Sequence, residues 1–284
     1  GIRDSSVTGV QTCALPILRG PSVRIIDASW YLPDMKRDAR AEYVKEHIPG
    51  AVFFDIDALS RRDTDLPHMM PDPETLARDL GALGIGDDDF VAAYDGYGIF
   101  SATRPWWMLR VMGHDRVAVL DGGLPKWKRE GRALTAETPS ISSKTFTPKP
   151  APHLLRGIED VKANLSSRAE QMVDARGTGR FEAIEPEPRA GVRGGHIPGG
   201  RNVHYASVLK DGVMRPAAEL RALFAKQGVD LTQPVIASCG SGITACTVMM
   251  AAEIAGAKHV SVYDGSWTEW GSHRDPPVET GKAR

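Results

Sequence analysis

Four blocks of sequence occur twice, in the same order, and this repeat limits the folds that the chain can adopt. The matching ranges are 24–29 with 171–176, 46–50 with 195–199, 91–99 with 235–243, and 117–127 with 260–270. Four ordered matches over one long period indicate two copies of one domain. In each copy, short apolar strands alternate with helical segments. This pattern predicts two tandem α/β domains, each with a mainly parallel sheet flanked by helices.

The two ends of the chain and its middle suggest the domain boundaries. Residues 7–17 match the translation of a common sequencing adapter, so we interpret residues 1–18 as an assembly artefact and Cys13 as non-native. We place domain 1 at 19–136, a linker rich in Pro, Ser and Thr at 137–152, and domain 2 at 153–284. The artefact replaces a segment where a helix is expected. An enzyme that has lost stability with its native start is therefore an open alternative.

The composition argues against several classes of function. A formal net charge of −1 gives no general case for a nucleic-acid partner or for an anionic membrane surface. No apolar run approaches the ~20 residues that span a bilayer. Three cysteines are too few for a disulfide framework, which predicts a reducing, cytoplasmic location. The sequence has no C-x-x-C pair and no cluster of metal ligands, so we expect no metal site.

One cysteine of domain 2 lies where a predicted strand meets a predicted helix. The apolar run 234–238 precedes Cys239, and an apolar helical segment at 245–256 follows the loop. Gly240 and Gly242 let the backbone curl so that successive N–H groups point at the sulfur, which stabilises an anion such as a thiolate. The repeat places Asp95 at the matching position of domain 1, and aspartate cannot act as a thiol nucleophile. We therefore favour a reactive Cys239 over a cysteine that only packs in a turn.

Basic residues crowd one segment of domain 2. They are Arg176, Arg180, Arg189, Arg193 and Arg201. Arginine matches a carboxylate with two parallel hydrogen bonds, so this segment could bind an anionic substrate. The alternative is a solvated surface whose charge is balanced by Glu182, Glu185 and Glu187, and the residues alone favour that alternative.

Polar residues elsewhere offer weaker signals. Asp57, His68 and Ser241 could form a hydrogen-bonded proton relay, but such triples are common by chance in a chain of this size. His47 and His196 occupy matching repeat positions, so we expect structural roles for both. Cys246 fits packing in an apolar helix, with a resolving thiol as the alternative.

The motifs resemble those of the two-domain sulfurtransferases built from tandem rhodanese domains. Residues 43–51 are similar to the N-terminal signature of that family, and residues 260–270 to its C-terminal signature. The loop at 239–244, Cys-Gly-Ser-Gly-Ile-Thr, is similar to the Cys-Gly-Ser-Gly-Val-Thr loop of members that use 3-mercaptopyruvate. Members that use thiosulfate carry a cationic loop instead. The resemblance covers nearly everything from residue 23 to residue 270 and implies two rhodanese-like domains.

The resemblance also implies roles for individual residues. Cys239 would carry the sulfur as a persulfide, with the backbone of Gly240, Gly242, Ile243 and Thr244 around it. Arg180 and Arg189 would hold the carboxylate of 3-mercaptopyruvate, which reverses the surface interpretation of these two arginines. Asp57, His68 and Ser241 would form the relay. The sulfur would pass to a thiol acceptor such as thioredoxin, or to cyanide in an assay, with release of pyruvate and without a cofactor.

Other functions remain open at this point. A cysteine phosphatase needs an arginine six residues after its cysteine, and this chain has Ala245 there, which argues against that class. A thiosulfate-using sulfurtransferase is the nearest alternative. A persulfide carrier or regulatory module without turnover belongs to a different class. A steady-state assay of pyruvate release would distinguish that carrier from an enzyme.

Overall fold

The computed structural model describes residues 9–11 and 22–283, which form two compact units. Unit 1 runs to Arg61 and continues through Pro71–Ala151 and Asp211–Met214. Unit 2 comprises Arg62–Met70, Pro152–Lys210 and Arg215–Arg284. The units follow the two repeats closely. Two short segments differ from the predicted domains at 19–136 and 153–284, because Arg62–Met70 belongs to unit 2 and Asp211–Met214 belongs to unit 1.

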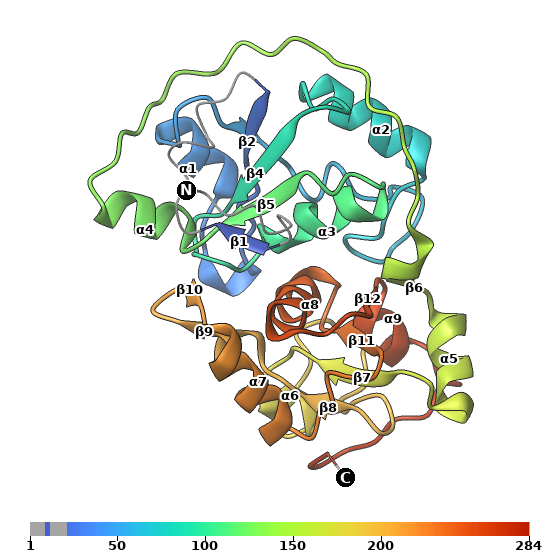
Figure 1. Cartoon of the computed structure of the whole chain (residues 1–284). Helices are drawn as coiled ribbons and strands as arrows, with labels where there is room; N and C mark the ends of the chain where they lie inside the picture. The colour runs from blue at the N-terminus through green and yellow to red at the C-terminus, as the bar shows by residue number, and fades with distance from the viewer. Residues whose placement is uncertain (1–8, 12–21, 284) are drawn as a thin grey trace. The chain divides into compact units, whose positions relative to one another are not determined.

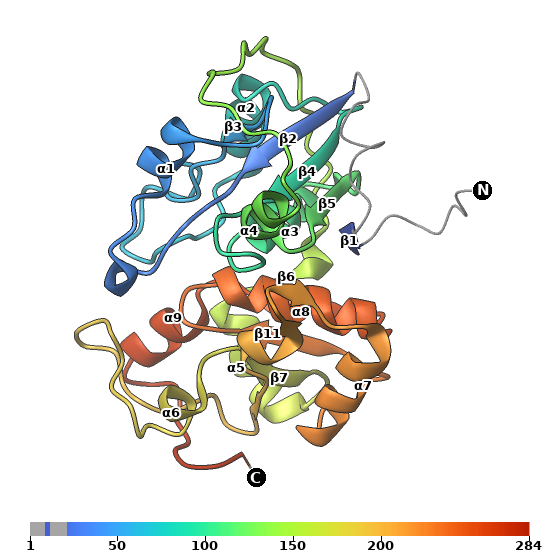
Figure 2. The ribbon, with the colours of Figure 1, turned by 90° about the vertical axis from the view of Figure 1, so that its left-hand side faces the viewer.

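Unit 1 contains one five-stranded sheet in the order β1-β5-β4-β2-β3, and every pairing in it is parallel (Figure 1); all five strands are labelled in Figure 2. Its strands are β1 (Gly9–Gln11), β2 (Val23–Asp27), β3 (Val52–Phe53), β4 (Phe90–Tyr94) and β5 (Val117–Leu120), with β10 (Val213–Met214) outside the sheet. Its helices are η1 (Pro33–Met35), α1 (Ala39–Lys45), α2 (Pro73–Ala82), α3 (Thr103–Val111) and α4 (Gly123–Arg129).

Unit 2 repeats this topology with the strand order β6-β12-β11-β7-β8, again with parallel pairings (Figure 1). Its strands are β6 (Leu155–Arg156), β7 (Gln171–Asp174), β8 (Arg201–Asn202), β11 (Val235–Ser238) and β12 (Val260–Tyr263), with β9 (Leu209–Lys210) outside the sheet. Its helices are η2 (Pro152–Leu154), α5 (Ile158–Ser167), α6 (Thr178–Phe181), η3 (Tyr205–Val208), α7 (Ala217–Lys226), α8 (Ile243–Ala255) and α9 (Ser266–Ser272). The predicted pair of α/β domains is confirmed.

The ends of the predicted blocks become the cores of the two units. Trp127 packs with Ile25, Tyr94 and Leu124 in unit 1, and Trp270 packs with Met172, Ile236 and Trp267 in unit 2. Each tryptophan donates its indole N–H to a backbone carbonyl, that of Ala133 or that of Pro277, at 2.8 and 2.9 Å. Burial of a large apolar ring with a satisfied N–H stabilises both copies in the same way.

Two short helical features explain how the chain enters its helices. The Asp72 side chain accepts the amide N–H of Thr75 at 2.8 Å, and Pro73 begins α2, which is a common helix start. Helix α8 begins at Ile243, two residues before the predicted start, because Gly242 adopts φ +81° and turns the chain directly into the helix. Helix α8 packs on β11 and β12 and is covered by α7.

The segment predicted as a linker contains no helix or strand from residue 136 to residue 151. It is nevertheless fixed along unit 1 (Figure 1). The amides of Lys144, Lys149 and Ala151 donate to carbonyls of Gly81, Met112 and Val111 at 2.7–3.0 Å, and Lys144 Nζ pairs with the Asp89 carboxylate. The polar composition therefore correctly indicated a segment without helix or strand, but this segment is hydrogen-bonded along unit 1.

The segment interpreted as an adapter artefact lies mostly outside the described residues, and Cys13 with it. Its described part is β1, which pairs in parallel with β5 although we interpreted these residues as an artefact. A ladder of three residues uses only main-chain groups, so it does not depend on where these residues come from. No helix among residues 9–11 and 22–283 is long and apolar enough to cross a membrane.

Candidate active site

The Cys239 loop begins where β11 ends, at the centre of the sheet of unit 2. Cys239 is buried, and its Sγ accepts the amide N–H of Gly242 at 3.1 Å. The Cys239 amide donates to Ser266 Oγ at 3.1 Å, and its carbonyl accepts the amide of Trp267 at 3.0 Å. The loop is therefore tied at both sides to the start of α9, which holds the sulfur in a fixed position relative to the loop amides.

The matching loop of unit 1 shows what kind of group this geometry holds. There Asp95 follows the central strand β4, and both carboxylate oxygens are surrounded by main-chain N–H donors at 2.8–2.9 Å. The five donors are the amides of Tyr97, Gly98, Phe100, Ser101 and Ala102. Such a concave array of amides binds an anion. The repeat aligns Gly98 with Gly242, whose amide contacts the sulfur.

Gly240 opens the loop towards the basic segment. A Cβ at this position would lie 3.3 Å from Nη2 of Arg180, closer than most side-chain contacts allow. The Gly240 carbonyl accepts both the amide and the Oγ1 hydroxyl of Thr268, at 2.9 and 2.6 Å. Arg189 Nη1 donates to the same Oγ1 at 3.4 Å. Both predicted anion-binding arginines thus reach the Cys239 loop, Arg180 directly and Arg189 through Thr268.

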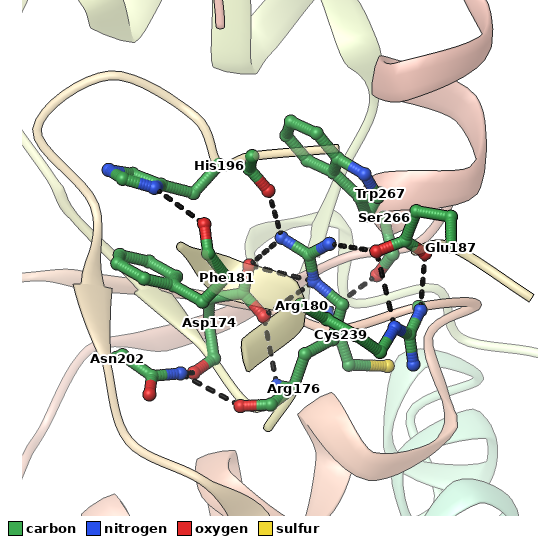
Figure 3. Close-up of polar contacts among 12 residues, drawn as sticks. Asp174, Arg176, Arg180, Phe181, Glu187, His196, Asn202, Cys239, Ser266 and Trp267 are labelled. Carbon is green, nitrogen blue, oxygen red and sulfur yellow. Dashed lines mark hydrogen bonds and ion pairs between the residues drawn. The ribbon is translucent and has the colours of Figure 1, made fainter. Parts of the chain in front are cut away.

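The other arginines of the segment have different surroundings. Arg176 is buried; it pairs with Asp174 and Glu187 and lies over the Trp267 ring at 4.4 Å (Figure 3). Burial alone would lower the pKa of Arg176, but the two carboxylates outweigh burial and raise it, so this side chain stays charged. Arg193 donates to the carbonyls of Trp270, Gly271 and Pro276. The interpretation of these arginines as a solvated surface is wrong for Arg176 and Arg193.

Two of the three relay residues meet in unit 2. His68 belongs to the segment Arg62–Met70, which Met70 ties to unit 2 through a 2.7 Å bond from its amide to Asp264. His68 Nδ1 lies 2.9 Å from Ser241 Oγ. Asp57 belongs to unit 1, where its carboxylate accepts the indole N–H of Trp30 at 3.1 Å. The serine and histidine pair is thus present, while the role of Asp57 stays a prediction from the resemblance.

The remaining candidates have structural surroundings. His47 and His196 are buried, stack on Tyr43 and Phe181 respectively, and contact the backbone carbonyl of the same residue through Nδ1. The equivalent geometry in both repeats supports the expected structural roles. Cys246 is buried in α8, and its thiol donates to the Gly242 carbonyl at 3.2 Å. This contact supports packing of Cys246 beneath the loop.

Several residues of the site have no role that the sequence could assign. Ser266, Thr268 and Glu187 each contact the loop or its arginines, as described above. Ser266 and Thr268 lie in the C-terminal signature at residues 260–270. That motif indicated the family, but it did not indicate what these two side chains contact. Glu187 was placed in a surface role with Glu182 and Glu185, yet only 4% of its side chain is exposed.

A groove of about 710 Å³ lies elsewhere in unit 2, beside Leu165, Met172 and Val278. Arg201 of the basic segment lines it, whereas Cys239, Arg180 and Arg189 do not. Among the described residues no group of three or more His, Cys, Asp or Glu side chains could hold a metal ion.

The chain is similar to known proteins over most of its length. The family model for the rhodanese-like domain matches residues 16–130 and again residues 158–273. Over 88% of this chain and 86% of the relative, the sequence is 45% identical to 3-mercaptopyruvate sulfurtransferase of Homo sapiens. It is 43% identical to thiosulfate/3-mercaptopyruvate sulfurtransferase 1, mitochondrial, of Arabidopsis thaliana, over 93% of this chain and 75% of the relative.

A solved structure gives the same result at the level of the fold. The crystal structure of SseA from Escherichia coli, described as a 3-mercaptopyruvate sulfotransferase with the rhodanese fold, superposes with a TM-score of 0.82. The match has 38% sequence identity and covers 89% of this chain and 96% of that one. The chain therefore belongs to the rhodanese family, in the tandem-domain form that includes the 3-mercaptopyruvate sulfurtransferases.

Proposed function

We propose that the protein is a sulfurtransferase that moves sulfur from 3-mercaptopyruvate through a persulfide on Cys239 to a thiol acceptor. The observation that carries the proposal is the pair of matching loops. The carboxylate of Asp95 and the persulfide of a cysteine both extend two atoms beyond Cβ, and both are anions. Five amides around Asp95 are therefore the pattern expected of a loop that stabilises a persulfide on Cys239.

In the first half-reaction, the Cys239 thiolate attacks the sulfur of 3-mercaptopyruvate. A sulfur–sulfur bond forms and the carbon–sulfur bond breaks, and its electron pair leaves with carbon as the enolate of pyruvate. Protonation of that enolate gives pyruvate. This is covalent catalysis by an activated nucleophile. Gly242 supports it because its amide already contacts Sγ.

We assign the substrate carboxylate and keto oxygen to Arg180 and Arg189. Arg180 is within reach of Gly240, and Arg189 is linked to the same residue through Thr268. The loop itself contributes no cationic side chain between Cys239 and Thr244. We assign the stabilisation of the transferred sulfur to amides of this loop, of which that of Gly242 already contacts Sγ.

Proton movement is assigned to Ser241 and His68. Their 2.9 Å contact lets the hydroxyl and the imidazole exchange a proton beside the reacting sulfur. Asp57 is the proposed third member on the strength of the family resemblance alone. Its carboxylate would keep the imidazole in one tautomer, as in other serine–histidine–acid relays.

In the second half-reaction, an acceptor thiolate such as that of reduced thioredoxin attacks the outer sulfur. The bond between the two sulfurs breaks, and Cys239 leaves as the thiolate. Neither step needs a metal or an organic cofactor. Because the acceptor is a reduced thiol, the reaction fits the cytoplasmic location that cysteine usage predicts.

A steady-state assay of pyruvate release tests the proposal. The wild type should turn over many times with 3-mercaptopyruvate and a reduced thiol acceptor. Cys239→Ser should abolish turnover, while the matched variant Cys246→Ser should retain it. A stoichiometric release of pyruvate that then stops would favour the persulfide-carrier alternative. A higher kcat/KM with thiosulfate than with 3-mercaptopyruvate would contradict the proposed donor.

A further inference from the structure

A row of four charged side chains, Asp174, Arg176, Glu187 and Arg180, runs from the interior of unit 2 to the Cys239 loop. Arg176 donates to the Asp174 carboxylate at 2.6 and 3.1 Å and to Glu187 Oε1 at 2.7 Å. Glu187 in turn accepts Arg180 Nε at 3.2 Å on Oε1 and Arg180 Nη2 at 2.5 Å on Oε2. Negative and positive side chains alternate along this row, and the formal charges of its four members sum to zero (Figure 3).

Within this row of four side chains, Glu187 determines the charge next to the Cys239 loop. Its side chain is 4% exposed and is shared between two guanidinium groups, whereas the Arg180 side chain is 24% exposed. Arg180 uses Nε and Nη2 for Glu187, and Nη2 is the atom nearest to Gly240. The Arg180 fork is therefore fixed in direction, and its charge is balanced before any substrate arrives.

Unit 1 has a similar pair with the charges exchanged. Tyr43 stacks on His47 as Phe181 stacks on His196, so the preceding residues, Glu42 and Arg180, occupy matching positions. Glu42 is held by two bonds from Arg37, at 2.6 and 2.8 Å. Both units thus place a charge-balanced pair at this point, and only the unit with the thiol presents the cation from the helix.

We propose that Glu187 is a specificity-determining residue that selects monoanionic sulfur donors over dianionic ones. It rests on the proposed sulfur transfer at Cys239. With Glu187 present, Arg180 can still donate to one carboxylate, but its charge is cancelled within the row of four, and of the two proposed substrate-binding arginines only Arg189 lies outside that row. A dianion such as thiosulfate would need a second, uncancelled charge on Arg180, while 3-mercaptopyruvate, with one ionised carboxylate, would not.

The test compares two donors that differ mainly in charge. Thiosulfate is a dianion, and methanethiosulfonate is a monoanion in which a methyl group replaces one oxygen. Either donor transfers its outer sulfur to the Cys239 thiolate, and the sulfur–sulfur bond breaks with its electron pair on sulfite or on methanesulfinate. Steady-state kcat/KM for each, with one fixed thiol acceptor, gives the selectivity ratio.

We expect the wild type to prefer methanethiosulfonate. Glu187→Gln keeps an oxygen acceptor but removes the negative charge, and should shift the ratio towards thiosulfate by about tenfold, as one added charge near a partly exposed site would. Glu187→Asp restores the charge and should return the ratio towards that of the wild type. Glu185→Gln makes the same chemical change two residues away on the exposed surface and should leave the ratio unchanged.

Each result decides the proposal. An unchanged ratio in folded Glu187→Gln, or an equal shift in Glu185→Gln, would overturn it. If Glu187→Gln does not fold, a wild-type preference for thiosulfate would overturn it as well, and a loss of selectivity in Glu187→Asp would do the same. Failure of the proposed sulfur transfer would give a different result. The wild type would then transfer sulfur from none of the donors 3-mercaptopyruvate, methanethiosulfonate and thiosulfate.

Discussion

Asp95→Asn is expected to destabilise unit 1 strongly although the change alters one atom of a residue without a catalytic role. The Asp95 carboxylate accepts two amides on Oδ1 and three on Oδ2. Asparagine can keep its carbonyl oxygen on the three-amide side. Its NH₂ group would then face the amides of Tyr97 and Gly98, which would lose their acceptor.

The magnitude follows from those two amides. A buried donor left without a partner costs about 1–3 kcal/mol, so the two together should lower the free energy of unfolding by about 2–6 kcal/mol. The lower end is more realistic because the Tyr97 side of the loop is partly exposed. Urea unfolding monitored by far-UV circular dichroism measures the change, with the first transition assigned to unit 1 by limited proteolysis.

Asp88→Asn provides the control, because it makes the same change at a neighbouring exposed position. It should shift the unfolding midpoint very little. If Asp95→Asn proves as stable as Asp88→Asn, the loop does not depend on an anion. The inference from the Asp95 loop to a persulfide on Cys239 would then lose its basis.

Three further changes test other parts of the site. His68→Asn and Ser241→Ala should each lower kcat with 3-mercaptopyruvate by about 10²-fold or more. Because the two residues act as one unit, the double variant should lower kcat by little more than either single change. Stopped-flow measurement of pyruvate release checks this, and additive losses would argue against a shared relay. Gly242→Ala places a Cβ at φ +81°, so it should cost about 1–2 kcal/mol of stability and displace the amide that contacts Sγ, and a variant with wild-type melting temperature and kcat would refute the role of that turn. Burial raises the pKa of the Glu269 carboxyl above its ordinary value of 4.5, so the folded state holds this proton more tightly than the unfolded state, and the free energy of unfolding should fall as pH rises from 4.5 through the raised value. Glu269→Gln should remove that contribution and gain stability relative to the wild type on going from pH 4 to pH 7, whereas parallel pH dependence in the two proteins would contradict it.

The repeat made the fold predictable because each half carries its own evidence. The central strand before Cys239 was predicted within one residue of its observed start, since the apolar run 234–238 corresponds to β11 (Val235–Ser238) and such uninterrupted runs indicate buried parallel strands. The position of Cys239 at the end of a central strand followed from the same pattern. What the repeat could not predict was the assignment of Arg62–Met70 to unit 2, which depends on the long-range bonds of His68 and Met70.

The charged part of the site was less predictable for a physical reason. Glu182, Glu185 and Glu187 are alike in sequence, and the intervening prolines hide any periodicity. Only the fold shows that Glu187 turns inward to Arg176 and Arg180 while Glu185 stays exposed. Arg176 likewise could be separated from the substrate-binding arginines only through its burial against Asp174 and Trp267.

The most direct test of sulfur transfer is mass spectrometry of the protein after a single incubation with 3-mercaptopyruvate and no acceptor. Peptide mapping should find one added sulfur atom on Cys239, and addition of a reduced thiol should remove it. Cys239→Ser should carry no adduct, and Cys246→Ser should carry the same adduct as the wild type. An added sulfur on Cys246 alone, or none on any cysteine, would contradict the assignment of Cys239 as the residue that carries the sulfur.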